Sequence, residues 1–482
     1  MKRLTRVMVI LSVLAAMMAV FGGAAYAFPG GTWVSGVTVA NLSSELATVN
    51  IKFYKQDGST ALDFDAGTIA ANKAKTWYLP TQVSGLPDPF IGSAVVSSDK
   101  EIAAIVNTQF PSGSDPMRVG TSTGVGTPTE TVYATQLMKN YGGWNSYCAV
   151  QNTGSTEATG VQVTYYDADG NVEDTDTQNI AAYASYIFDQ SDDSELADGM
   201  YSAKFVGDSS HPLAVVCNFY NSGAAADSSQ FHSYNGLGAG GTTLYIPRVV
   251  KDYYDYQSGL KIQNVGSEAL DVTVTYTFGG TDYTQTSPSI GPGQSWGPYM
   301  GSEAQLPSSM AGVSQVSGSA IVAINSPNAN KQIIATINED NRVDPAGRGV
   351  TYEAALESDA TASLVFPQVT SEYYGYCSGV QVQKVSSGTA SCTASFSAMG
   401  SISAFDETFS LTDSDPSWDI FAPNGSGMVA GVENDNYNGS VTVSCPGAEV
   451  IGISNLSFRY DRDTRYGDVA GDTFTTARGI NK

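Results

Sequence analysis

The chain has 482 residues, with 47 Asp and Glu against 23 Lys and Arg and a formal net charge of -24 at pH 7. Nucleic acid is excluded as an expected partner, because affinity for its phosphate backbone comes largely from Lys and Arg. A chain of this length is also too long for one hydrophobic core, so we expect three or four domains.

The N-terminal segment has the pattern of a secretory signal peptide. Three basic residues precede an apolar run over residues 7–21, and small residues follow that end in Ala-Tyr-Ala at 25–27. We therefore expect residues 1–27 to be removed and the mature chain to be extracellular, secreted or bound at the cell surface. An uncleaved membrane anchor is the alternative. No later stretch is apolar and long enough to span a bilayer.

A nine-residue pattern occurs four times along the chain. It has an aromatic residue, then a serine, then alternating apolar residues, and its serines are spaced by 111, 112 and 120 residues: Ser35, Ser146, Ser258 and Ser378. An asparagine that follows a pair of apolar runs has nearly the same period: Asn107, Asn218, Asn338 and Asn455. The two markers together predict four repeats, which we place at 28–128, 129–239, 240–361 and 362–482.

The pattern of each repeat predicts β-strands rather than helices. Apolar residues alternate through the nine-residue stretches, as on a strand with one buried face, at 33–41, 144–152, 256–264 and 376–384. About seven such runs per repeat, separated by turn residues, are typical of an immunoglobulin-like sandwich. We predict an all-β chain of four tandem immunoglobulin-like β-sandwich domains after a cleaved signal peptide, and we interpret the recurrent asparagine as a turn or strand-end residue.

The first repeat is shorter than the others at its start. The later repeats have an extra strand-like run before the serine, at 131–137, 243–249 and 363–369, for which the mature first repeat has no room. The C-terminal segment resembles that run, and its candidate residues for a donated strand are Thr473, Phe474, Thr475 and Thr476. Strand addition to a neighbouring molecule would propagate into a filament. A strand used within its own domain and a frayed tail are the alternatives.

Five cysteines in a secreted chain leave at least one outside any internal disulfide. Cys148 and Cys217 stand where the other repeats have aliphatic residues, so both are expected in the core, either as a disulfide that bridges the two sheets or as two buried thiols. The fourth repeat contains Cys377, Cys392 and Cys445, and the sequence does not choose a pair among them.

Aromatic runs occur at the start of three repeats. Their candidate residues, for glycan stacking or for packing between repeats, are Trp144, Tyr253, Tyr254, Tyr256, Tyr373, Tyr374 and Tyr376. Flat aromatic faces suit sugar rings, but packing between neighbouring repeats needs them equally. Both interpretations remain open.

The sequence offers little for catalysis. Residues 120–124 fit G-x-S-x-G, but the stretch is interpreted as a linker rather than as the strand-turn-helix that exposes a nucleophilic serine. With two histidines in the chain, a triad has few candidates, so we do not expect an enzyme, and a hydrolase is only a third hypothesis.

No cofactor is expected, although calcium remains open. The run 167–171 (DADGN) resembles the start of a calcium loop but lacks the glutamate at its twelfth position, and a hairpin turn explains it equally. Looser calcium binding is open for four acidic residues: Asp189, Asp192, Asp193 and Glu195.

Residues 232–277 resemble the repeat unit of secreted bacterial tandem β-sandwich surface proteins. The resemblance is good in the second and third repeats and weakest in the fourth, where Lys384 replaces the expected asparagine. It implies a cell-surface structural protein that associates with itself, head to tail in a filament or layer, or with other surface proteins. The alternative is a carbohydrate-binding or adhesion protein that uses the aromatic runs.

Overall fold

The computed structural model describes residues 33–110, 117–221, 230–341, 347–399, 401–428, 436–458 and 471–482. The expected signal peptide lies outside the described residues. The described chain is all-β: its helical elements are single turns, and none of them is long and apolar enough to cross a membrane. The predicted fold class is confirmed, since eight sheets pair into four sandwiches.

The first two repeats contain fifteen of the strands. The first has β1 (Val34–Asn41), β2 (Ala47–Lys55), β3 (Thr60–Ile69), β4 (Ala74–Tyr78), α2 (Leu79–Gln82), β5 (Gly92–Ser98), β6 (Ile102–Phe110) and β7 (Met117–Thr123). The second has β8 (Thr131–Lys139), β9 (Trp144–Asn152), β10 (Ala158–Tyr166), β11 (Val172–Ile180), β12 (Ser185–Asp189), β13 (Gly199–Val206), β14 (Leu213–Asn221) and β15 (Phe231–Asn235).

The third and fourth repeats follow the same plan with short additions. The third has β16 (Thr243–Lys251), β17 (Tyr256–Asn264), β18 (Val272–Phe278), β19 (Thr281–Thr286), β20 (Ser295–Trp296), η1 (Glu303–Gln305), η2 (Ser308–Met310), β21 (Val316–Ile324), β22 (Ile333–Asn341), β23 (Arg348–Glu353), β24 (Ala355–Leu356) and η3 (Glu357–Asp359). The fourth has β25 (Ser363–Ser371), β26 (Tyr376–Lys384), β27 (Ala390–Phe396), β28 (Phe405–Leu411), β29 (Ser417–Phe421), η4 (Ala422–Asn424), β30 (Tyr437–Ser444), β31 (Val450–Phe458), β32 (Gly471–Asp472), β33 (Phe474–Arg478) and β34 (Ile480–Asn481).

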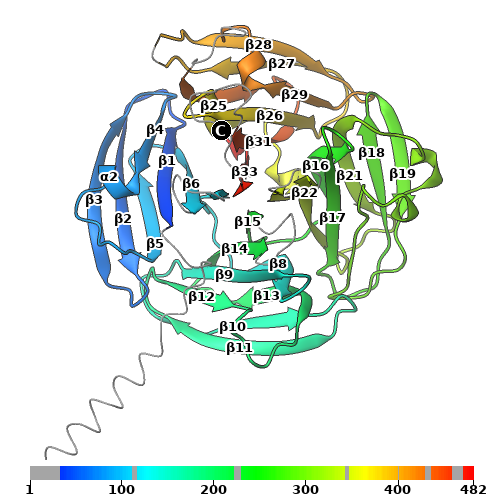
Figure 1. The fold of residues 1–482 in the computed structure, drawn as a ribbon, viewed down its shortest axis with the longest axis horizontal. Helices are drawn as coiled ribbons and strands as arrows, with labels where there is room; N and C mark the ends of the chain where they lie inside the picture. Colours follow the sequence, from blue (N-terminus) through cyan, green and yellow to red (C-terminus); the bar gives the residue numbers. More distant parts are fainter. Residues whose placement is uncertain are drawn as a thin grey trace, which may run out of the picture.

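Each sandwich has an inner and an outer sheet, named by their distance from the centre of the molecule (Figure 1). The inner sheets have the strand orders β32-β7-β6-β1-β4, β12-β9-β14-β15, β20-β17-β22-β23 and β29-β26-β31-β33. The outer sheets have the orders β3-β2-β5, β11-β10-β13-β8, β19-β18-β21-β16-β24 and β28-β27-β30-β25-β34. Almost all pairs are antiparallel, and each sandwich has its own apolar cluster.

Alternation along the strands explains these cores. In β2, the side chains of Ala47, Val49, Ile51 and Phe53 are buried, while Thr48 between them faces solvent. The strand ends in a turn where Gly58 has φ of 80°, a conformation that glycine adopts without strain. One face of the sheet therefore supplies the core and the other meets water.

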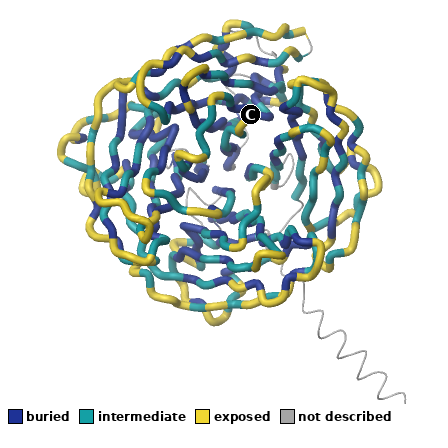
Figure 2. The backbone as a smooth tube through the Cα atoms, turned by 180° about the vertical axis from the view of Figure 1, so that it is seen from behind, coloured by how far each residue is buried: buried dark blue, intermediate teal, exposed yellow. Residues whose placement is uncertain are grey.

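The four sandwiches are arranged in a closed ring, a feature that the sequence did not predict. Figure 1 shows the repeats following one another around a common centre, with the fourth beside the first. Four strands, β7, β15, β23 and β33, meet near that centre and contact one another in the cyclic order β7, β15, β23, β33. Buried backbone lies mainly toward the inside and exposed backbone on the outer rim (Figure 2). The molecule is thus a ring of four units rather than an extended row.

The two sequence markers have distinct structural roles. In the second, third and fourth repeats, the serine hydroxyl accepts the backbone N–H of a residue in the preceding strand: Ser146 from Met138 at 2.7 Å, Ser258 from Val250 at 2.9 Å and Ser378 from Thr370 at 2.9 Å. The recurrent asparagine, which we interpreted as a strand-end residue, lies inside a strand: Asn107 in β6 and Asn338 in β22. That interpretation was wrong, because both strands continue three residues beyond the asparagine, to Phe110 and Asn341.

Candidate binding surfaces and the repeat junctions

The first strand of a repeat packs on the inner sheet of the next repeat. Gln136 of β8 accepts a hydrogen bond from Nδ2 of Asn338 in the third repeat at 2.6 Å. Gln368 of β25 accepts the equivalent bond from Asn107 in the first repeat, also at 2.6 Å. The second bond joins the last repeat to the first, so the same contact that links neighbours in sequence also closes the ring.

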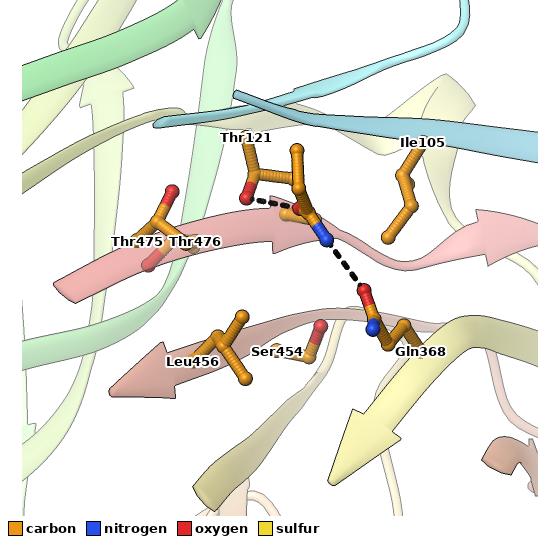
Figure 3. A pocket seen from close by; sticks show the side chains of 9 residues that line it. Ile105, Thr121, Gln368, Ser454, Leu456, Thr475 and Thr476 are labelled. Carbon is orange, nitrogen blue, oxygen red and sulfur yellow. Dashed lines mark hydrogen bonds between the residues drawn. The ribbon is translucent and has the colours of Figure 1, made fainter. Parts of the chain in front are cut away.

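The closing junction is tightly filled. The Thr121 hydroxyl donates to Oδ1 of Asn107 at 2.7 Å, which orients the amide toward Gln368. Figure 3 shows Thr121 and Gln368 with these bonds dashed, beside Leu456 of the fourth repeat. The cavity that remains among these side chains has a volume of about 10 Å³, room for a single water. The recurrent asparagine therefore holds repeats together through side-chain bonds.

A buried ion pair replaces the glutamine at the third repeat. Arg248 of β16 lies at the position of Gln136 and Gln368, and its guanidinium donates to both carboxylate oxygens of Glu339 at 2.8 Å. The Glu339 side chain is 1% exposed. Burial acts to lower the pKa of Arg248, but the charge and hydrogen bonds of Glu339 outweigh it and raise that pKa. The guanidinium of Arg248 is therefore charged, and its two hydrogen bonds hold it to the buried Glu339 side chain.

The central strands contain a histidine that connects two repeats. His232 of β15 bonds through Nδ1 to the hydroxyl of Thr351 in β23 at 2.9 Å. Its ring stacks on Phe219 with centroids 4.5 Å apart and meets the edge of Trp144 at 5.2 Å. Burial lowers the pKa of His232 to about 3, so the ring is neutral at physiological pH. No sequence pattern marks this role, beyond a single histidine between two aromatic residues of the run 231–234.

Asp472 connects three repeats at the same centre. Its carboxylate lies in the fourth repeat and accepts the backbone N–H of Phe231 at 2.9 Å and of Gly349 at 3.2 Å. Burial raises the pKa of Asp472 well above its ordinary value, while these N–H groups and the charge of Arg348 act in the opposite direction. No periodic pattern marks this residue, so sequence reasoning missed it.

The aromatic runs divide into buried and exposed members. They form two-residue turns between the first two strands of a repeat, and the last aromatic of each packs inward: Trp144 on His232, Tyr256 on Phe474, and Tyr376 on Phe458. The packing between β17 and β33 joins the third and fourth repeats. These three residues therefore serve packing.

Two tyrosines at the tips of these turns face solvent. Tyr254 is 73% exposed and Tyr374 is 60% exposed, and each packs edge-on against the preceding residue, Tyr253 or Tyr373, at 4.8 and 4.7 Å. The tip residues have φ of 51° and 50°, a region that costs a side chain bearing a Cβ about 1 kcal/mol or more. The second repeat has Gly142 at this turn position, so the tyrosines are not required by the turn.

Both disulfides join neighbouring strands of one sheet. Cys148 of β9 and Cys217 of β14 are directly opposite and bonded, with Cα atoms 4.1 Å apart. The expectation that this bond bridges the two sheets was wrong, because β9 and β14 are adjacent in the inner sheet. In the fourth repeat Cys392 pairs with Cys445, and Cys377 is buried and belongs to neither disulfide.

Acidic side chains gather on the outer sheet of the second repeat. Asp174, Asp176 and Asp193 each place one carboxylate oxygen within 4.8 Å of the others. Burial, and then the charges of Asp193 and Asp174, raise the pKa of Asp176. Of the residues considered for calcium, Asp193 belongs to this group, whereas Asp189 accepts the N–H of Ser191 at 2.9 Å. Asp192 and Glu195 are not members of it.

The run 167–171 is a turn between β10 and β11. Asp167 accepts the backbone N–H of Asp169 at 2.9 Å and that of Asn171 at 2.8 Å. Its carboxylate is therefore occupied by the turn, as the hairpin alternative required.

The C-terminal segment completes its own chain. Phe474, Thr475 and Thr476 lie in β33, which pairs with β31 of the same repeat, and Thr473 immediately precedes it. β34 then pairs with β25. In the structure this segment thus forms strands within its own chain, as in the alternative of a strand used within its own domain. The run 120–124 lies largely in β7, so its interpretation as a linker was also wrong.

Comparisons with known proteins found similar solved structures of low sequence identity. A scan against protein-family models found no match, and a search of curated proteins found none either. Among solved structures, a protein of Thermotoga maritima, 1070, is 16% identical over 24% of this chain and 96% of its own, with a TM-score of 0.19. A tetra-tandem repeat from the extending region of a large adhesion protein is 14% identical over 93% of this chain and 95% of its own, with a TM-score of 0.13.

Proposed function

We propose that the protein is a secreted, non-catalytic structural protein of the cell surface that presents binding surfaces on a rigid ring. The observation that supports this most directly is the cyclic set of junctions, in which the contact between Gln136 and Asn338 recurs between Gln368 and Asn107. Two disulfides within the sandwiches stabilise the fold further, and disulfides persist in oxidising compartments.

Ring closure changes the mode of assembly that we propose. A head-to-tail filament built through the C-terminal segment would need that segment to leave β31 and β25 of its own chain. We therefore propose that partners attach to the faces and edges of a closed ring, and that any filament or layer forms through those surfaces.

Imaging and cell labelling test the proposal. We expect negative-stain electron microscopy of the purified protein to show compact four-lobed rings, and an antibody to label intact cells without permeabilisation. Extended strings of four beads would contradict the ring, and labelling only after permeabilisation would contradict the location.

A carbohydrate-binding or adhesion role is a second candidate. The exposure of Tyr254 and Tyr374 supports it, since each ring is largely solvated and is held at a strained turn position. Sugar rings stack on such faces.

The matched test replaces both tip residues by the glycine of the second repeat. Tyr254→Gly with Tyr374→Gly should keep or slightly raise stability, because glycine adopts positive φ freely, and should abolish binding to cell-wall polysaccharide or a glycan array. Tyr186→Ser, at a residue 38% exposed on another strand, is the control for unspecific loss of aromatic surface. Unchanged glycan binding in the double variant would remove this candidate.

A further inference from the structure

The first repeat lacks, among the described residues, the strand that the other three repeats use at their junctions. Its outer sheet is β3-β2-β5, whereas the others continue past the equivalent of β5 to β8, β16 or β25. β5 pairs with β2 on one side, and on its other side no strand of the described chain lies beside it. The backbone N–H and C=O groups on that side therefore form an open sheet edge.

The core beside that edge is correspondingly open. Ala94 and Val96 of β5 are only partly buried, while their equivalents in the second repeat, Ala203 and Phe205, are 0% exposed. On the facing sheet, Ile102, Ala104 and Val106 are also partly buried. Val215 and Cys217, the equivalents of Ala104 and Val106 in the second repeat, are 1% and 0% exposed. An apolar slot therefore runs between β5 and β6.

Opposite β5, the slot is bordered by Val125, whose equivalent in the second repeat pairs with the first strand of that repeat. In the second repeat Leu237 exchanges two backbone hydrogen bonds of 2.8 Å with Tyr133 of β8. Val125 has the equivalent place in the first repeat, because Gly124 bonds to Ala104 as Gly236 bonds to Val215, both at 2.8 Å. Val125 is 37% exposed and Leu237 only 9%. A strand between β5 and Val125 would be paired on both sides.

Two marker residues around the slot also differ from their equivalents. The Ser35 hydroxyl bonds to Thr108 at 3.1 Å, where Ser146 and Ser258 accept a backbone N–H from the first strand of their repeat. In the second repeat, the Asn218 side chain has no hydrogen bond within the described chain, whereas Asn338 and Asn107 bond to the glutamines of β8 and β25. Asn218 stands where the first repeat's missing strand would reach.

We propose that this slot binds an extended strand of another polypeptide, which completes the first repeat and its junction with the second. Three strands of the chain define the chemistry of the occupant: TVYATQLMK in β8, TLYIPRVVK in β16 and SLVFPQVTS in β25. They share apolar residues at the second and fourth positions and Gln or Arg at the sixth. Affinity comes from backbone pairing along β5, and selectivity from the apolar side chains and the sixth residue.

The chain's own residues in that register are a poorer fit. They are 20–28, VFGGAAYAF, with two glycines at central positions and alanine at the sixth. Glycine weakens a strand and offers nothing to an apolar slot. Most of this stretch also belongs to the segment expected to be removed with the signal peptide.

A peptide with the sequence of Thr131–Lys139 provides the probe, because its sixth residue is the glutamine that bonds to an asparagine of another repeat. We expect the fluorescein-labelled peptide to bind the secreted protein one to one with micromolar affinity in fluorescence anisotropy. Val96→Asp should weaken binding about tenfold or more, because it places a charge in the apolar slot. Asn218→Ala should weaken it less, through loss of the bond to the sixth residue. Val172→Asp, at a residue 59% exposed on the outer sheet of the second repeat, is the matched control and should bind normally.

A fused variant keeps the test decisive if Val96→Asp fails to fold. The β8 sequence joined ahead of Phe28 by a short Gly-Ser linker should raise the melting temperature and abolish binding of the free peptide. Absence of peptide binding to the folded wild-type protein would overturn the proposal, as would equal binding by Val96→Asp. An intact mass that shows residues 20–28 retained, with their amides protected from hydrogen exchange, would overturn it in favour of the chain's own segment. The assay does not depend on cell location, so its failure is distinguishable from failure of the proposed function.

Discussion

Arg248→Gln should strongly destabilise the protein although glutamine occupies the same position in two other repeats. The variant leaves the Glu339 carboxylate, 1% exposed, without the guanidinium that donates to both of its oxygens. Removing one partner of a buried ion pair costs about 3–5 kcal/mol, because the remaining charge is uncompensated. Urea denaturation followed by circular dichroism measures the loss.

The double variant Arg248→Gln with Glu339→Thr should recover most of that loss. Glutamine at this position follows the second and fourth repeats, and threonine follows the first repeat, where Thr108 stands opposite Ser35 as Glu339 stands opposite Ser258. We expect stability within about 1 kcal/mol of the wild type, and therefore a coupling energy of about 2–4 kcal/mol in the double-mutant cycle.

An exposed ion pair provides the control for this cycle. Lys100 pairs with Glu45, but the side chains are 30% and 67% exposed, so Lys100→Gln should cost less than about 1 kcal/mol. Additive effects of the two changes at Arg248 and Glu339, or a loss at Arg248 as small as that at Lys100, would refute the reasoning that burial makes this pair interdependent.

Three further predictions concern pH, the disulfide and the acidic group. Because folding lowers the pKa of His232 from 6.5 to about 3, stability should fall as the pH drops below 6.5, by about 2 kcal/mol at pH 5, and urea titrations of His232→Gln should lack this component. Cys148→Leu with Cys217→Ile keeps an aliphatic pair but opens a loop of 69 residues, so urea titrations should show a loss of about 4 kcal/mol. Asp176→Asn should raise the free energy of unfolding at pH 7 by less than about 1 kcal/mol, because burial and the neighbouring carboxylates raise the pKa of Asp176. Calorimetry should show a slightly higher melting temperature at pH 7, and this gain should vanish at low pH, where the carboxyl groups are protonated.

The strands were predictable because their signal is local. The alternation that buries Val37 and Val39 in β1 is repeated in each nine-residue stretch, and a strand's two faces are determined by residues two apart. The four sandwiches follow from that pattern and its spacing. The last strand of the first repeat, β7, was missed because its Gly, Ser and Thr residues resemble a linker and its pairing with β6 involves residues distant in sequence.

The disulfide illustrates a finer limit. Both Cys148 and Cys217 were correctly expected in the core, since aliphatic residues replace them elsewhere. Whether two core residues lie across the sandwich or side by side depends on the order of strands in the sheet, and β14 is beside β9 although 60 residues separate the end of β9 from the start of β14. The alternation along a strand shows which face of the sheet a residue lies on, but it does not show which strand lies beside it.

Ring closure could not be predicted from the sequence because it depends on polar contacts without a period. Asn107 and Gln368 are 261 residues apart, and each is one amide among many in the chain. Asp472 is likewise a single acid among 47 acidic residues, yet it accepts N–H groups from two other repeats. Such residues are recognisable only once the chain has brought their partners within hydrogen-bond distance.

The closed ring gives the shortened first repeat a significance that a linear array would not. In a row of four sandwiches, the first unit needs no strand to reach a preceding neighbour, so a missing first strand would merely shorten one end. In the ring, each first strand completes its own outer sheet and also contacts the following repeat, as β8 does through Gln136. Four junctions therefore require four such strands, and the described chain supplies β8, β16 and β25. The fourth position lies between the first and second repeats, beside β5, and there the apolar side chain of Val96 remains partly exposed.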